Sequence, residues 1–259
     1  MFANQKIVVV MPAYNSAVTL KQTYEEVMAQ GVVDCVVIVD DASRDETVQV
    51  AKTLAHARLF VHEKNTGYGG NQKTCYRLAL EAGADIVVMV HPDYQYTPKL
   101  IPAMVALIAN GLYSCVLGSR ILGGNALQGG MPPWKYIANR VLTFGENLLL
   151  GAKLSEYHTG YRAFSRELLL RLALDKNSDD FVFDNQMLAQ IIWAGDTIAE
   201  ISCPTKYFAA ASSISFRRSV KYGIGCVATA LEFRLARMGL YQPARFKFPD
   251  RSTGPTAAV

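Results

Sequence analysis

The sequence predicts an α/β protein with a mostly parallel central sheet, and two observations support this prediction. First, the runs KIVVVMP (6–12), CVVIVDD (35–41) and ADIVVMVHPD (84–93) are almost continuously apolar and rich in β-branched residues. Such runs are typical of strands that are buried on both faces of a sheet. Second, helical stretches separate the runs, and this alternation favours parallel strands with right-handed crossovers. A weaker run, RLFVHE (58–63), is a fourth candidate strand.

Local signals place the first helices between these strands. Ser16 or Thr19 could cap a helix that runs to about residue 30. Ser43 with Glu46 three residues later is a capping-box pattern, which predicts a helix to about residue 56. Residues 70–82 are predicted to form a third helix.

The second half of the chain is less regular. Residues 117–133 are rich in Gly and Pro and predict a long loop. Residues 100–119 are uncharged and long enough to span a bilayer, but the Pro, Asn and Gly among them favour a helix, a turn and a strand. The remaining expected elements are a helix at 134–150, a turn into a helix at 158–172, a helix at 184–195 and a strand at 197–204.

Composition and charge limit the classes of protein that the sequence can encode. The chain has 259 residues, of which 51% are hydrophobic and 19% charged, which excludes disordered, collagen-like and coiled-coil proteins. Five scattered cysteines and no recognised secretory signal favour a reducing compartment. Residues 206–259 hold nine Lys/Arg and two Asp/Glu, so this basic end suggests an anionic partner such as lipid or phosphate, unless it is ordinary surface charge.

Polar side chains follow three of the predicted strands. The first strand ends in PAYN (12–15), the second in Asp40 and Asp41, and the third in HPDYQ (91–95). Parallel sheets bind ligands at the carboxyl ends of their strands, so we expect these groups to face one crevice. A carboxylate there could accept hydrogen bonds from a ribose or a base, or it could cap the following helix.

The third strand end offers metal ligands. Asp93 and Gln95 supply oxygen atoms and His91 an imidazole. Such a set could hold Mg²⁺ or Mn²⁺ between the protein and a diphosphate. The alternative is a loop in which Asp93 caps the helix near Pro98.

The segment NTGYGGNQK (65–73) precedes the third helix. Its glycines would let backbone amides approach a ligand, and Lys73 would add positive charge. It matches neither the dinucleotide-binding fingerprint nor the P-loop, so we expect neither nicotinamide binding nor P-loop chemistry.

Together, PAYN (12–15), VDDASRDET (39–47), NTGYGGN (65–71) and the D-x-Q element (93–95) resemble family 2 glycosyltransferases. Within that family the chain is most similar to the dolichyl-phosphate and polyprenyl-phosphate sugar transferases, as GSR (118–120) and TGYR (159–162) also indicate. The resemblance covers roughly residues 5–210. It implies a nucleotide-sugar-binding domain of the GT-A type.

The resemblance also implies a role for each matching residue. Asp93 and Gln95 would hold the metal and the diphosphate, and Arg120 would neutralise a phosphate. His91 stands where the family usually has the first Asp of an Asp-x-Asp motif. Asp184 matches an acidic position that serves as a base in relatives with hydroxyl acceptors, although a helix cap is the alternative. The other implied substrate contacts are the base pocket at Pro12, Ala13 and Tyr14, the base or ribose contact at Asp41, and the acceptor contacts at Arg162 and Lys206.

The implied activity is inverting transfer of a sugar from a nucleotide-diphosphate donor to a dolichyl or undecaprenyl phosphate, with Mg²⁺ or Mn²⁺. A phosphate acceptor is already anionic and needs no general base. The alternatives are a hydroxyl acceptor on a saccharide or a lipid headgroup, with Asp184 as base, or a non-catalytic nucleotide-sugar-binding protein. We expect a peripheral protein at the cytoplasmic face of the membrane, possible self-association, and no nucleic-acid partner.

The C-terminal part divides into two expected segments after the domain at 1–210. Residues 211–248 are predicted to form a basic amphipathic helical segment, and 249–259 a disordered tail. The apolar face of the helix would lie in a membrane interface, or else pack on the domain or on a second subunit. That face consists of Val220, Ile224, Val227, Leu231, Leu235 and Met238.

Overall fold

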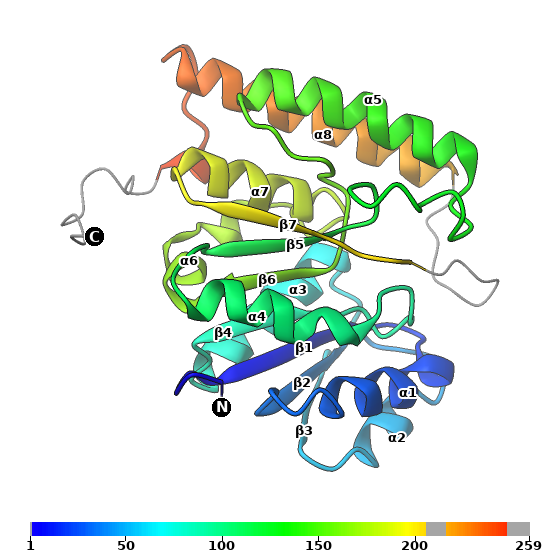
Figure 1. The fold of residues 1–259 in the computed structure, drawn as a ribbon. Coiled ribbons are helices and arrows are strands. Elements are labelled where there is room, and N and C mark those ends of the chain that lie inside the picture. The colour runs from blue at the N-terminus through cyan, green and yellow to red at the C-terminus, as the bar shows by residue number, and fades with distance from the viewer. Residues whose placement is uncertain (1, 206–215, 248–259) are drawn as a thin grey trace.

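A computed structural model describes residues 2–205 and 216–247. Seven strands form one sheet in the order β3-β2-β1-β4-β6-β5-β7 (Figure 1). Neighbouring strands pair in parallel, except that β6 is antiparallel to both β4 and β5. The predicted mostly parallel sheet is therefore confirmed. The strands are β1 (Ile7–Ala13), β2 (Cys35–Asp40), β3 (Ala57–Val61), β4 (Ile86–Met89), β5 (Cys115–Ser119), β6 (Arg162–Ser165) and β7 (Ile198–Ser202).

Helices cover both faces of the sheet. The uncharged run at 100–119 contains a helix, a turn and a strand, as predicted. The stretch at 158–172, predicted as a turn into a helix, also contains β6, because four residues are too few to show an alternating pattern and are held instead by pairing with β4 and β5. The helices are α1 (Ala17–Met28), α2 (Thr47–Lys52), α3 (Tyr68–Glu81), α4 (Ile101–Ala109), α5 (Pro133–Leu150), α6 (Arg166–Arg171), α7 (Phe183–Trp193) and α8 (Phe216–Arg237).

The predicted capping box at Ser43 and Glu46 is wrong. The Ser43 hydroxyl accepts a hydrogen bond from the Asn15 amide (2.9 Å), and the Ser43 amide donates to Asp40 (2.9 Å). Helix α2 starts only at Thr47, whose amide is capped by Asp45. Ser43 instead ties the end of β1 to the end of β2, so it helps to fix the loops at the carboxyl edge of the sheet.

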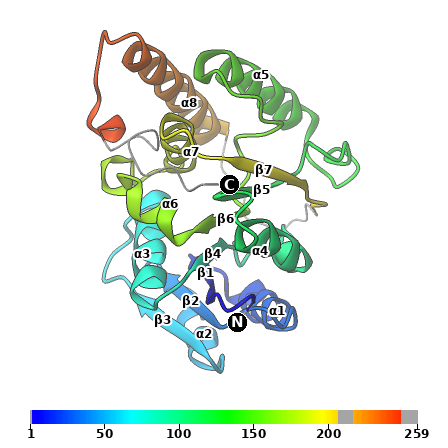
Figure 2. The ribbon, with the colours of Figure 1, turned by 60° about the vertical axis from the view of Figure 1, so that its left-hand side comes forward.

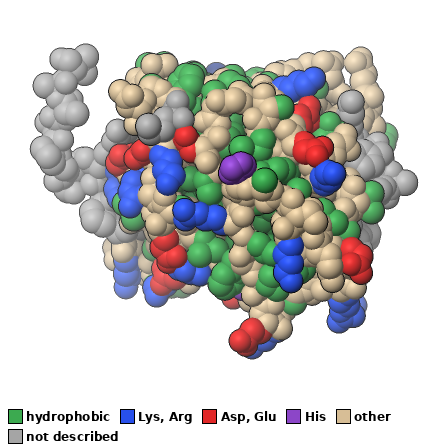
Figure 3. All heavy atoms as spheres, turned by 90° about the horizontal axis from the view of Figure 1, so that it is seen from below, with side chains coloured by type: hydrophobic (Ala, Val, Ile, Leu, Met, Phe, Trp, Pro, Cys, Tyr) green, Lys and Arg blue, Asp and Glu red, His purple; other side chains and the backbone are tan. Residues whose placement is uncertain are grey.

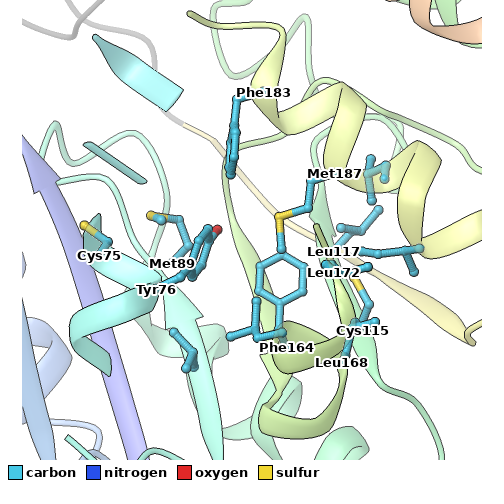
Figure 4. Close-up of a cluster of buried hydrophobic side chains, with 14 of the residues drawn as sticks. Cys75, Tyr76, Met89, Cys115, Leu117, Phe164, Leu168, Leu172, Phe183 and Met187 are labelled. Carbon is cyan, nitrogen blue, oxygen red and sulfur yellow. The ribbon is translucent and has the colours of Figure 1, made fainter. Parts of the chain in front are cut away.

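Two apolar clusters hold the sheet between its helices. On one face, Tyr76 of α3, Phe164 of β6 and Phe183 and Met187 of α7 gather in a single cluster (Figure 4). On the other face α1 and α4 cover alternate residues of the same strands. Because β1, β2 and β4 are buried on both sides, the loops at their carboxyl ends start from rigid positions.

Helices α5 and α8 run side by side in an outer layer (Figures 1 and 2). Helix α8 turns Cys226, Ala230, Phe233 and Ala236 inward, and all four side chains are buried. Its predicted apolar face, from Val220 to Met238, is confirmed as one side of the helix, and this side points outward and is exposed. On the opposite side of the molecule, acidic and basic side chains are interspersed (Figure 3).

Candidate active site

A cavity of about 340 Å³ opens at the carboxyl edge of the sheet. Residues far apart in sequence line it: Tyr14 and Ser16 after β1, the segment 91–96 after β4, and Arg120 after β5. Asp184 of α7 closes one wall. The structure therefore brings together His91, Asp93, Gln95, Arg120 and Asp184, which the sequence identified separately.

The loop after β4 is shaped by one residue in a left-handed conformation. Tyr94 has φ +58°, an unfavourable value for a residue other than Gly, Asn or Asp. The loop is anchored to α1, because the Thr19 hydroxyl donates to the carbonyl of Pro92. The Asp93 carboxylate accepts from the Gln95 amide (3.1 Å), and both side chains line the cavity.

Asp184 is held by two donors. The Tyr68 hydroxyl donates to its Oδ2 (2.6 Å) and the Gln72 amide group to its Oδ1 (3.0 Å). The side chain is only 9% exposed, and an Arg162 nitrogen lies 3.8 Å from Oδ1. Asp184 is thus a fixed polar wall of the cavity.

Arg120 already has an anionic partner. Its Nε and Nη2 donate to Oε1 of Glu156, its backbone amide donates to Oε2 (2.8 Å), and Nη2 also donates to the carbonyl of His158 (2.7 Å). Burial by itself would raise the pKa of the fully buried Glu156, but the charge and hydrogen bonds of Arg120 lower it overall. The carboxylate therefore fixes the guanidinium at the cavity wall.

A second cation, Lys135, was not predicted from the sequence. It lies in the first turn of α5 and lines the same cavity as Arg120. Burial and the nearby Arg120 lower its pKa. Within residues 2–205 and 216–247, no carboxylate lies within ion-pair distance of its ammonium group. Two neighbouring cations with only one buried counter-ion form an environment that suits an added anion.

Asp41 lies at the predicted strand end, but its carboxylate is used within the protein. It accepts from the amide and hydroxyl of Thr66, the amide of Gly67 and the ring of His62. It is 2% exposed and does not line the cavity. The neighbouring Asp40 has a buried Oδ1 without a hydrogen-bond partner among the described residues. The spare acceptor at this strand end is therefore on Asp40.

The other predicted substrate contacts are placed as follows. Pro12 and Ala13 are buried in β1, and Tyr14 is 47% exposed at the cavity. The Lys73 ammonium donates to Asp179 and to a carbonyl outside the cavity. Arg162 is fully buried and donates to three backbone carbonyls. Because the donors of Lys73 and Arg162 are engaged away from the cavity, the structure does not favour these two predicted contacts. Lys206 lies outside the described residues.

Three potential metal ligands converge elsewhere. In the described part of the chain, one set of three His, Cys, Asp or Glu ligand atoms lies within 4.8 Å of one another, and it consists of Glu146, His158 and Cys226. His91 and Asp93 belong to no such set. A divalent ion at the β4 loop would therefore need further ligands from Gln95, from water or from bound phosphates, which is how Mg²⁺ is usually held.

Glu146 and His158 make folding stability depend on pH. Burial raises the pKa of Glu146 from 4.5 to about 8 and lowers the pKa of His158 from 6.5 to about 4. Between pH 4.5 and 6.5, rising pH removes stability through Glu146 and adds it through His158, so the effects oppose each other. Between pH 6.5 and 8, only Glu146 of this pair still differs in protonation between the folded and unfolded states, because the folded protein keeps a proton on Glu146 that the unfolded chain has released. Stability should fall there by about 2 kcal/mol.

This pH dependence is tested by the Glu146→Gln variant. A glutamine amide keeps the shape of the protonated acid and can still accept from Asn185, and its second polar atom replaces Oε2, which lies 3.3 Å from His158 Nε2. Urea unfolding at pH 6.5 and 8.0 should show the decline in the native protein and not in the variant. An equal decline in both proteins would exclude Glu146 as its source.

Comparison with known proteins identifies the class. The family model described as glycosyl transferase family 2 matches residues 8–172, and the chain belongs to this family. A UDP-N-acetylglucosamine–dolichyl-phosphate N-acetylglucosaminyltransferase of Methanococcus voltae is 31% identical over 64% of this chain and 72% of its own length. An undecaprenyl-phosphate mannosyltransferase of Micrococcus luteus is 27% identical over 76% and 82%.

Solved structures confirm the predicted GT-A fold. Glucosyl-3-phosphoglycerate synthase from Mycobacterium tuberculosis, in complex with Mn²⁺, uridine diphosphate and glucosyl-3-phosphoglycerate, aligns with a TM-score of 0.68. The alignment covers 93% of this chain and 82% of that one, at 20% sequence identity. The family match and the named relatives make the protein a glycosyltransferase.

Proposed function

We propose that this glycosyltransferase moves a sugar, with inversion, from a nucleotide-diphosphate donor to a polyprenyl phosphate. The main support is that a cavity with cationic side chains adjoins an apolar groove. Arg120 and Lys135 line the cavity, and Leu142 lines both this cavity and an apolar groove between α5 and α8. A ligand with a phosphate head and a hydrocarbon chain matches this sequence of surfaces. The names of the two relatives support the same acceptor class.

The donor side of the proposal uses the carboxyl ends of the strands. Asp93 and Gln95, with His91, would hold a divalent Mg²⁺ or Mn²⁺ ion and the diphosphate. The Mn²⁺ and uridine diphosphate in the synthase of similar fold support a divalent ion and a nucleotide diphosphate as the ligands. Such an ion stabilises the negative charge that develops on the leaving nucleotide.

The acceptor side needs cations but no base. A phosphate monoester carries its own nucleophilic charge at pH 7, so Arg120 and Lys135 have only to position and partly neutralise it. Asp184 is not required to take a proton in this reaction. A hydroxyl acceptor, by contrast, would need such a base, and Asp184 at the cavity wall is the candidate for that second function.

The outer face of α5 and α8 supports a location at a membrane surface. On α5, Ile137, Val141, Phe144 and Leu148 are each more than 60% exposed, at steps of four, three and four. Helix α5 packs beside α8, whose own apolar face is also exposed. Exposed Arg217 and Arg218 begin α8 and would meet anionic headgroups. None of the described helices combines the length and apolarity that crossing a bilayer requires. We place the protein on the cytoplasmic face.

Replacing both Ile137 and Ile224 by Asp should weaken binding to vesicles of phosphatidylglycerol and phosphatidylcholine by at least about tenfold, because each change removes a side chain whose burial contributes about 1.5–3 kcal/mol. Leu170→Asp is the matched control, since Leu170 is 61% exposed on α6, away from this face. Sedimentation with the vesicles measures the binding. Equal binding by all three proteins would contradict the membrane contact.

The proposed function is tested by a panel of labelled nucleotide sugars with three acceptors in membranes: a polyprenyl phosphate, the corresponding free polyprenol, and a saccharide. The result expected is labelled lipid with the phosphate alone, abolished by EDTA. Transfer to the polyprenol or the saccharide would favour the hydroxyl-acceptor function instead. Donor binding without transfer to any acceptor would favour a binding protein.

A further inference from the structure

Three side chains from separate elements form a hydrogen-bond chain in the cavity wall. The hydroxyl of Tyr68, at the start of α3, lies 2.6 Å from Oδ2 of Asp184 on α7. The same hydroxyl lies 3.1 Å from Nε2 of His91 in the β4 loop. Through the Tyr68 hydroxyl, the chain connects His91, which departs from the family motif, to the carboxylate of Asp184.

The direction of each hydrogen bond follows from the donors available. Asp184 accepts from Gln72 on its other oxygen, so its carboxylate acts as an acceptor on both sides. Because the Asp184 carboxylate is an acceptor, the Tyr68 hydroxyl donates its hydrogen across the 2.6 Å contact with Oδ2. With that proton used, the phenol oxygen can only accept from His91, so Nε2 of His91 carries the hydrogen. A neutral imidazole with this tautomer has its lone pair on Nδ1.

The His91 ring is also held sterically. It stacks on the Tyr68 ring, with centroids 5.5 Å apart and planes 13° apart, and the Tyr68 ring packs in turn on Phe181 (4.8 Å). The backbone of Gly160 lies against the ring edge, because a Cβ atom there would be 2.6 Å from Nε2. Both the tautomer and the orientation of His91 are thus fixed before any ligand binds.

We propose that His91 is a ligand of the divalent ion through Nδ1, and that the Tyr68–Asp184 pair is the hydrogen-bonded support that sets its tautomer. This inference rests on the metal site of the proposed function. Histidine ligands usually donate their second ring N–H to such a partner, and losing that partner typically weakens metal binding by 10–100-fold. In this view Tyr68 is a positioning residue. Because Mg²⁺ is a hard cation that takes oxygen ligands, an imidazole nitrogen in the coordination shell disfavours it, and the site should prefer Mn²⁺.

The first test is Tyr68→Phe, which removes the hydroxyl but keeps the ring. Mn²⁺ affinity in the presence of UDP, measured by electron paramagnetic resonance, should fall about 10–100-fold. Tyr157→Phe is the control, because Tyr157 is a buried phenol that donates to Asn147 (2.9 Å) and does not line the cavity. Its Mn²⁺ affinity should stay that of the native protein. Thermal unfolding of both variants shows whether either has lost its fold.

Two further measurements do not depend on the folding of Tyr68→Phe. Nitrogen NMR of the histidine-labelled protein without metal should show His91 with its hydrogen on Nε2. His91→Asp should shift the ratio of Mg²⁺ to Mn²⁺ affinity towards Mg²⁺, and His91→Ala should weaken binding of both ions.

The inference and the proposed function can fail separately. A hydrogen on Nδ1, or native Mn²⁺ affinity in both Tyr68→Phe and His91→Ala, would overturn the inference while leaving a metal site on Asp93 intact. Absence of Mn²⁺ binding by the native protein with UDP would instead overturn the donor site of the proposed function.

Discussion

Substituting Asp93 by Asn should lower sugar transfer by about 10²–10³-fold or more, the range found when one group that stabilises transition-state charge is lost. The asparagine oxygen can still accept the hydrogen bond from the Gln95 amide, so the loop after β4 should keep its shape. What is lost is one negative charge facing the cavity. The variant therefore isolates the proposed grip on the metal and the diphosphate, and transfer of labelled sugar to polyprenyl phosphate measures the loss.

The control is Asp85→Asn. Asp85 immediately precedes β4, at the end of that strand opposite to the loop with Asp93, and its carboxylate accepts from the backbone amide of Lys6. Its substitution should leave transfer unchanged. Near-native transfer by Asp93→Asn, at saturating metal, would contradict the assignment of Asp93.

Replacing Arg120 by Leu should reduce stability by about 3–5 kcal/mol, because Glu156 would keep its buried charge without a partner. The double variant Arg120→Leu with Glu156→Gln should recover part of that loss, because the remaining buried group is then neutral. Urea unfolding measures both. Unchanged stability in the single variant would show that the pair is not a structural anchor.

Arg120 has two proposed roles, the structural ion pair with Glu156 and the contact with the acceptor phosphate, whereas Lys135 has only the second. Lys135→Leu removes a cavity cation that has no carboxylate partner among the described residues, so stability should change little. The KM for polyprenyl phosphate should rise, while the KM for the nucleotide sugar should not. A rise in the donor KM instead would move Lys135 to the donor side.

The parts of the fold that depend on local pattern were predictable. The parallel strands β1, β2 and β4 are recognisable in the sequence as apolar runs. Because the strands are parallel, the residues that follow them meet at the carboxyl edge of the sheet. The metal candidates at 91–95 followed from the same reasoning. The apolar face of α8 followed from its spacing, whereas its exposure was known only from the structure.

The roles of the other site residues depend on contacts between distant parts of the chain, which the spacing of residues in the sequence does not reveal. The Asp41 carboxylate is taken up by the turn at 65–67, so the free oxygen at that strand end is on Asp40. Arg162 resembled a substrate contact in sequence but is surrounded by carbonyl groups. Lys135 became visible only once α5 was placed over the cavity, although a lysine in the first turn after a Gly- and Pro-rich loop was the available signal.

A crystal structure of the protein with Mn²⁺ and UDP would show whether the donor binds at the carboxyl edge of the sheet. We expect the ion within coordination distance of Asp93, the diphosphate in the cavity lined by Tyr14, Arg120 and Asp184, and the base beside the end of β2. A nucleotide bound away from the carboxyl edge of the sheet, or an ion held without Asp93, would contradict this expectation.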